Sequence, residues 1–249
     1  MIQKPAAMKQ DDEVTQIGEV FATPVVVKGL TWLPLTELAV WGIMAWVAGR
    51  DHPVRSWLKR LGLGALTMPV ILGSEWCHNL AHAAAAYLIG KPMDAVRVTW
   101  GMPVVFYHDV NDESVTPRQH IVRALGGPVI NSVLLSFAVM IRRFSRSGSV
   151  AREVVDVAVG MNLFLSTVSL LPIPGIDGGP ILRWALVDQG YDLEGADEMV
   201  RQVDKITGVG LGVGAVAAFQ QKRRFIGFIL AMFSVIALAF GWGLIREGD

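Results

Sequence analysis

The sequence is poor in charged residues. Asp, Glu, Lys and Arg make up 18% of its 249 residues, whereas about a quarter is usual in soluble globular proteins. The 22 basic and 22 acidic residues balance, so no net charge would attract nucleic acid. A single cysteine excludes an internal disulfide. Hydrophobic residues reach 52% and the mean hydropathy is +0.44, so the composition indicates a membrane protein.

Six apolar segments approach the roughly 20 residues that a transmembrane helix needs. They cover residues 29–49, 61–89, 121–141, 154–171, 206–219 and 225–245. The fifth is short and carries glycine at every second position from Gly208 to Gly214, and such small residues let membrane helices approach closely. We therefore expect an all-α, multi-pass protein of the cell membrane with about six transmembrane helices. Residues 1–28 would form a polar N-terminal segment, and residues 29–249 a single membrane domain.

One segment between the second and third apolar runs differs from the others. Residues 95–107, AVRVTWGMPVVFY, are rich in β-branched and aromatic residues, with Gly101 and Pro103 in the middle. This composition predicts a short β-hairpin or edge strand. It is compatible with a surface loop and with a strand that faces a substrate.

Residues 74–82, SEWCHNLAH, place two histidines four residues apart. In a helix, His78 and His82 lie on one face, one turn apart. Neutral imidazoles at this spacing can bind one zinc ion and leave positions for a third ligand and a water molecule. The alternative is a pair of polar core residues bonded to neighbouring helices. Ionisable residues inside membrane helices are costly and usually functional, so the pair favours a metal site.

Glu75 lies on the same helical face, one turn before His78. The spacing E-x-x-H is also the ligand pair of di-iron helix bundles, which need two copies. The sequence contains one copy, so the di-iron interpretation fails. Glu75 could hydrogen-bond a metal ligand, act as a fourth ligand, or serve as a displaced base. The alternative is a carboxylate on the helix face that is paired with a basic side chain.

A third ligand could come from residues 169–182, SLLPIPGIDGGPIL. Pro172 and Pro174 lack a backbone donor and end the preceding apolar helix, while Gly178 and Gly179 allow a tight turn or a close approach. This arrangement would hold the Asp177 carboxylate at a fixed height beside the membrane helices. Taken alone, the same residues also suit an ordinary turn.

Together these segments resemble the site-2 protease family of intramembrane zinc metalloproteases. The family's H-E-x-x-H motif corresponds to residues 78–82, and its N-L-L-P-I-P-P-L-D-G-G-like stretch to residues 169–179. A third stretch, A-G-P-x-x-N-like, corresponds to ALGGPVIN with Pro128 and Asn131, and Asn162 also matches a family asparagine.

The resemblance covers about residues 61–220. It implies one Zn²⁺ per chain, held by His78, His82 and Asp177. It also implies hydrolysis of peptide bonds in or near the transmembrane segments of other membrane proteins, within the lipid bilayer. Substrate selection would depend on the strand near residues 95–107 and on the gap between helices.

The sequence departs from the family pattern at the general base. Family members use the glutamate after the first histidine to take a proton from water, and Asn79 occupies that position. An amide can hydrogen-bond water but cannot accept that proton at neutral pH. Ser169 and Gly175 also differ from the family's asparagine and second proline.

Three hypotheses follow. The chain is an active protease in which Glu75 or another acid replaces the missing base. Alternatively, it is a catalytically inactive zinc-binding scaffold or regulator of membrane proteins. In the third case, the asparagine at position 79 was introduced in place of glutamate to trap an inactive state.

Basic residues suggest an orientation in the membrane. With six alternating spans, the loops around residues 50–60, 142–152 and 222–224 lie on one face, which the positive-inside rule assigns to the cytoplasm. His78 and Asp177 would then lie nearer the opposite face, whereas the family resemblance implies a site nearer the cytoplasm. The two arguments conflict.

Overall fold

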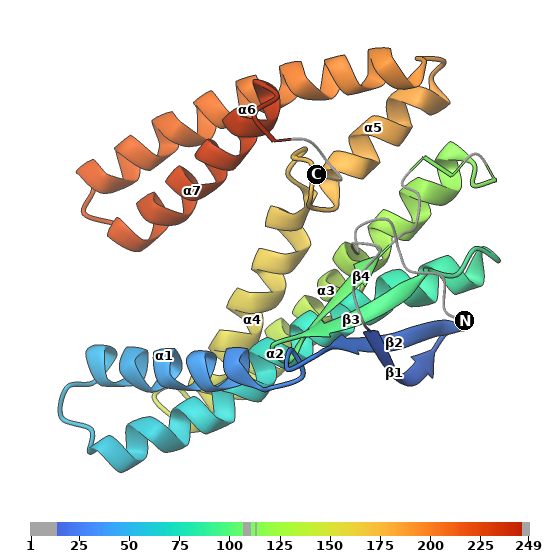
Figure 1. Cartoon of the computed structure of the whole chain (residues 1–249). Coiled ribbons are helices and arrows are strands. Elements are labelled where there is room, and N and C mark those ends of the chain that lie inside the picture. Colours follow the sequence, from blue (N-terminus) through green and yellow to red (C-terminus); the bar gives the residue numbers. More distant parts are fainter. Residues whose placement is uncertain (1–13, 107–110, 113, 246–249) are drawn as a thin grey trace. The chain divides into compact units, whose positions relative to one another are not determined.

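The computed structural model describes residues 14–106, 111, 112 and 114–245, which form two compact units (Figure 1). The first unit contains the described residues up to position 112 together with residues 126–168. The second contains residues 114–125 and 169–245. The third long helix contributes to both.

A four-stranded sheet forms part of the first unit. Its strands are β1 (Val14–Val20), β2 (Thr23–Lys28), β3 (Ala95–Thr99) and β4 (Met102–Phe106), in the order β1-β2-β3-β4. The outer pairs are antiparallel, and β2 and β3 are parallel, with Val26 opposite Arg97.

The β3–β4 hairpin confirms the strand prediction, although Tyr107 lies outside the described residues. The sheet also contains two strands that were not expected: β2 pairs with β3 of the hairpin, and β1 pairs with β2. Val26 is fully buried against Ala95. Val96 packs on Ala83 and Ala86 of the second helix, so burial of the apolar side chains of β2 and β3 explains the extra strands.

The helices of the first unit are α1 (Leu35–Asp51), α2 (Trp57–Leu88), α4 (Val150–Thr167) and most of α3 (Pro117–Phe144). Helices α1 and α2 pack closely because Gly64 has no side chain: a Cβ there would lie 2.8 Å from the carbonyl oxygen of Trp41. The Trp41 indole also donates a hydrogen bond to the Leu61 carbonyl, at 2.9 Å.

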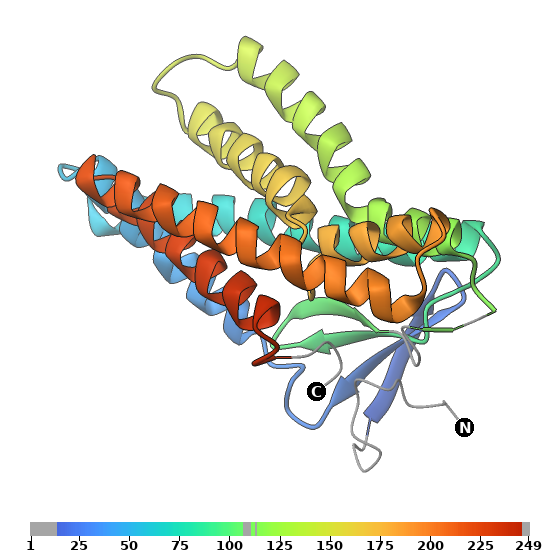
Figure 2. The same cartoon turned by 90° about the horizontal axis from the view of Figure 1, so that it is seen from above.

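The second unit contains α5 (Gly178–Asp188), α6 (Leu193–Gln220) and α7 (Arg224–Gly241). Helices α6 and α7 form an antiparallel pair (Figure 2). A Cβ on Gly208 would lie 2.6 Å from Leu238 Cγ, and one on Gly212 would lie 3.0 Å from Ser234 Oγ. The expected close approach is therefore made at these two glycines, four residues apart, while Gly210 has open space around it.

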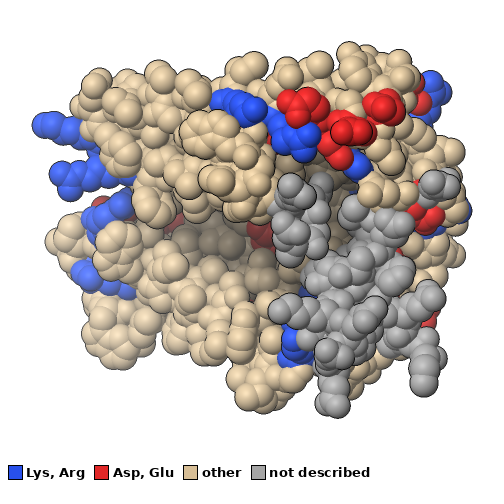
Figure 3. Space-filling model, turned by 45° about the horizontal axis from the view of Figure 1, so that its top comes forward, with Lys and Arg blue, Asp and Glu red and all other residues tan. Residues whose placement is uncertain are grey.

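Helices occupy all six expected apolar segments, and α5 is an additional one. Among the described residues, three segments are long and apolar enough to cross a membrane: Pro117–Phe144, Val150–Leu170 and Arg224–Gly241. Six crossings are thus not confirmed. Broad areas of the face in Figure 3 carry no Lys, Arg, Asp or Glu.

Candidate metal centre

Two buried histidines face each other on α2. His78 is 7% and His82 4% exposed, and their rings meet nearly edge to face with centroids 4.8 Å apart. The two Nε2 atoms are 3.1 Å apart. The spacing of four residues thus brings one nitrogen from each ring to the same point, as the sequence predicts.

A chain of hydrogen bonds from three helices fixes the orientation of His78. Its Nδ1 lies 2.7 Å from Oδ1 of Asn131 on α3. The Asn131 amide donates to Oδ1 of Asn162 on α4, at 2.8 Å, and the Asn162 amide donates to Oγ of Ser74 on α2, at 3.0 Å. The Ser74 hydroxyl donates to the Val70 carbonyl, at 2.9 Å.

This series of hydrogen bonds determines which ring nitrogen of His78 carries the proton. An amide oxygen can only accept, so Nδ1 of His78 must donate. The Nε2 of the neutral ring then presents its lone pair to His82. Such a hydrogen bond on the far nitrogen is typical of metal-binding histidines. Asn131 and Asn162, expected only to match family positions, therefore orient the histidine.

Two glycines of α3 make room for the imidazoles. A Cβ on Gly127 would lie 2.5 Å from both His78 Cε1 and His82 Nε2, and one on Gly126 would lie 2.5 Å from the Ala81 carbonyl oxygen. The Gly127 backbone N–H also points at His82 Nδ1, at 3.4 Å. The next residue, Pro128, is buried and has no N–H to donate within the helix.

Asn79 and Glu75 lie on the same helix and are both half-buried. The Asn79 amide donates to the Glu75 backbone carbonyl, at 3.1 Å. A glutamate carboxylate at position 79 could not make this bond, because it has no hydrogen to donate. Glu75 is the one acidic residue of α2.

The β3–β4 hairpin is tied to the histidine-bearing helix. Its two-residue turn, Trp100–Gly101, has positive φ at both positions (53° and 90°), as a type I′ turn requires. The Trp76 indole, two residues before His78, donates to the Gly101 carbonyl at 3.1 Å. Strand β4 is an edge strand, paired only with β3 among the described residues.

Asp177 belongs to the second unit and is half-buried. It ends the Pro172–Pro174 turn, in which Ile173 is 1% exposed, and α5 starts at the next residue. A Cβ on Gly178 would collide with the carbonyl oxygens of Leu170 and Leu171, and one on Gly179 would lie 2.5 Å from that of Ile173. Both glycines are therefore needed for this tight turn.

Comparison with known proteins finds similarity in fold. No protein-family model matches the chain, and no curated protein matches it in sequence. The solved structure of the site-2 protease from Methanocaldococcus jannaschii is similar, with a TM-score of 0.53 and 13% identity over 95% of this chain and 96% of that one. The chain thus has a site-2 protease-like fold. With its three apolar helices, this fold indicates an integral membrane protein.

Proposed function

We propose that this protein is an intramembrane zinc metalloprotease that hydrolyses peptide bonds in or near the transmembrane segments of other membrane proteins. The observation that carries the proposal is the oriented histidine pair on α2 of a site-2 protease-like fold. Helices α1, α2 and α6 would cross the bilayer together with α3, α4 and α7, in the plasma membrane.

The histidine pair fits a shared zinc ion. Two nitrogens at tetrahedral Zn–N bonds of about 2.0–2.1 Å are separated by about 3.3 Å, close to the 3.1 Å between the two Nε2 atoms. By the resemblance of residues 169–179 to the family's second motif, Asp177 would supply a carboxylate oxygen as the third ligand beside the two imidazole nitrogens of His78 and His82. A bound zinc ion would polarise the scissile carbonyl and acidify a water molecule.

The residues of the chain supply positioning and proton transfer. The free edge of β4 would add the substrate as an extended strand, at a place fixed to α2 by Trp76. Asn79 can hydrogen-bond the attacking water but cannot take its proton. Glu75, the one acidic residue of α2, is then the candidate base on that helix.

The test is metal content followed by proteolysis. Purified full-length chain should hold about one zinc per chain by elemental analysis, and His78→Ala, His82→Ala and Asp177→Ala should each lower it strongly. Cleavage of a model transmembrane substrate should rise by about 10² or more in Asn79→Glu, the usual worth of a general base. Gly73→Ala is the control on α2, because its Cβ would meet nothing within 4 Å.

The results of these measurements distinguish a protease from an inactive scaffold and a base from a ligand at Glu75. Absence of any transition metal under metal-sparing conditions would refute the site. Zinc without cleavage in both wild type and Asn79→Glu would favour the inactive scaffold. The Glu75→Gln substitution is made in the wild-type chain. If the variant keeps zinc but loses the residual cleavage, Glu75 is the base; if it loses zinc, Glu75 is a ligand.

A further inference from the structure

The loops α1–α2 and α3–α4 meet at one end of the first unit. Arg55, in the first loop, pairs with Glu153 at the start of α4, with Nη1 and Oε2 2.8 Å apart. This hydrogen bond raises the pKa of Arg55 above its usual value. Helices α3 and α4 are candidate membrane spans, so the end of the α3–α4 pair that carries their connecting loop lies at a membrane surface.

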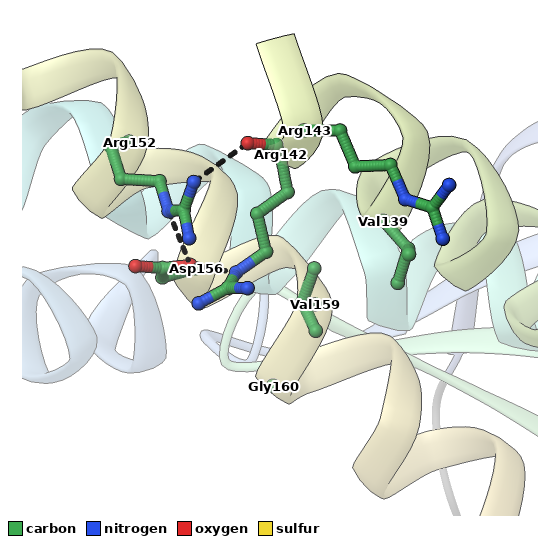
Figure 4. A pocket seen from close by; sticks show the side chains of 7 residues that line it. All are labelled: Val139, Arg142, Arg143, Arg152, Asp156, Val159 and Gly160. Atoms are coloured by element: carbon green, nitrogen blue, oxygen red, sulfur yellow. Dashed lines mark hydrogen bonds and ion pairs between the residues drawn. The ribbon is translucent and has the colours of Figure 1, made fainter. Parts of the chain in front are cut away.

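A pocket of about 640 Å³ opens at this end. Its charged lining consists of Arg142 and Arg143 on α3 and Arg152 and Asp156 on α4. Figure 4 shows Arg142 and Arg152 converging on Asp156, while Arg143 extends away from them. The Nε atoms of Arg142 and Arg152 are 2.5 and 3.3 Å from Asp156 Oδ1.

The charges around the pocket favour an anion. Residues 142–156 contain four arginines and two carboxylates. One carboxylate, Glu153, is paired with Arg55 from the other loop. The other, Asp156, is shared by two arginines. Arg142 and Asp156 are 45% and 44% exposed, so an incoming anion can reach the pair.

The pocket is also partly apolar. Val139 and Val159, from the two membrane helices, line it beside the arginines. A ligand that fits both features carries a phosphate and hydrocarbon chains. Arginine forks match phosphate oxygens in bidentate hydrogen bonds, and basic pockets between membrane helices on the cytoplasmic side bind anionic headgroups.

We propose that this pocket binds the phosphate of an anionic phospholipid headgroup, with the acyl chains along Val139 and Val159. Asp156 holds Arg142 and Arg152 together and competes with the phosphate for them. The proposal is independent of metal binding and proteolysis. It also places this end of the molecule in the leaflet that carries anionic lipid, which agrees with the positive-inside assignment.

The experiment is a lipid titration of the detergent-purified full chain, followed by native mass spectrometry, with phosphatidylglycerol and phosphatidylcholine. Wild type should bind phosphatidylglycerol more tightly. Arg142→Gln/Arg152→Gln should weaken that binding about tenfold or more, since each arginine contributes about a factor of five. Asp156→Asn should strengthen it, because it removes the competing carboxylate. Binding of phosphatidylcholine should change little.

Arg118→Gln is the matched control. Arg118 lies in the first turn of α3, at the opposite end of the same helix, and also pairs with a carboxylate, Asp188. Its loss should leave the preference for phosphatidylglycerol unchanged. If the double variant proves unstable, two single variants test the charge dependence. Arg143→Gln should lower the affinity for phosphatidylglycerol, and Asp156→Asn should raise it.

Three results would overturn the proposal. The first is equal binding of the two lipids by wild type. The second is phosphatidylglycerol binding that neither the arginine variants nor Asp156→Asn alters. The third is complete displacement of phosphatidylglycerol by millimolar inorganic phosphate, which would identify a site for a soluble phosphate instead.

Discussion

The imidazole Nδ1 of His78 lies 2.7 Å from the amide Oδ1 of Asn131, which links α2 to α3 at the centre of the candidate site. Because the amide oxygen only accepts, this contact leaves the Nε2 lone pair of His78 directed at His82. Asn131 is fully buried, and its own amide is held by Asn162. The orientation of a proposed zinc ligand thus depends on a residue outside the proposed ligand set.

Asn131→Ala should weaken zinc binding by about 10- to 100-fold, the usual effect of removing a hydrogen-bond partner of a ligating histidine. Asn131→Asp keeps an acceptor for Nδ1 and should lose less. Competition with a chromophoric chelator measures both affinities. Equal affinities in Asn131→Ala and wild type would show that His78 needs no such partner.

Gly127→Ala should displace the histidine rings, because the added Cβ would lie 2.5 Å from atoms of both. We expect loss of most bound zinc and destabilisation of about 1–3 kcal/mol from overpacking. Elemental analysis and thermal unfolding in lipid measure the two effects. Gly62→Ala on α2, where a Cβ meets nothing within 4 Å, should keep both zinc and stability; a similar loss there would point to a general intolerance of α2 and α3 to substitution.

Gly178→Ala should disrupt the turn that carries Asp177, because the new Cβ would collide with backbone carbonyls, which cannot rotate away. The expected result is lower thermal stability of the chain and reduced zinc content. Gly210→Ala on α6, with open space around it, is the control and should be neutral or slightly stabilising. Normal zinc and stability in Gly178→Ala would contradict the need for glycine there.

Much of the architecture could be predicted because its causes are local. A bilayer demands long apolar runs, and these marked the positions of α1–α4, α6 and α7. Helical geometry alone brings His78 and His82 together. The β-branched residues around Trp100–Gly101 predicted the hairpin, whose turn is closed within two residues.

The remaining features depend on packing between distant segments. Strand β2, TPVVVK, does not alternate apolar and polar residues, so it lacks the usual periodicity of a half-buried strand. Its parallel partner β3 is also far along the chain. The roles of Ser74 and Gly127 were also missed. Nothing local in the sequence shows that Ser74 accepts from Asn162, or that Gly127 faces two imidazoles, because both contacts join different helices.

The Trp76–Gly101 hydrogen bond leads to a last prediction, which separates substrate positioning from stability. Trp76→Phe removes the indole donor that ties the β3–β4 turn to α2 but leaves the histidines in place. A hydrogen bond of this kind contributes about 0.5–1.5 kcal/mol, so proteolysis by the Asn79→Glu variant should fall about three- to tenfold at subsaturating substrate, with zinc content unchanged.

Trp41→Phe is the matched control, because its indole also donates to a backbone carbonyl, that of Leu61, but joins α1 to α2. Trp41→Phe should lower thermal stability about as much as Trp76→Phe does, because each removes one hydrogen bond, but it should not cause the same loss of cleavage. If both variants lose cleavage equally, the hairpin has no special part in holding the substrate, and its edge strand would be structural only.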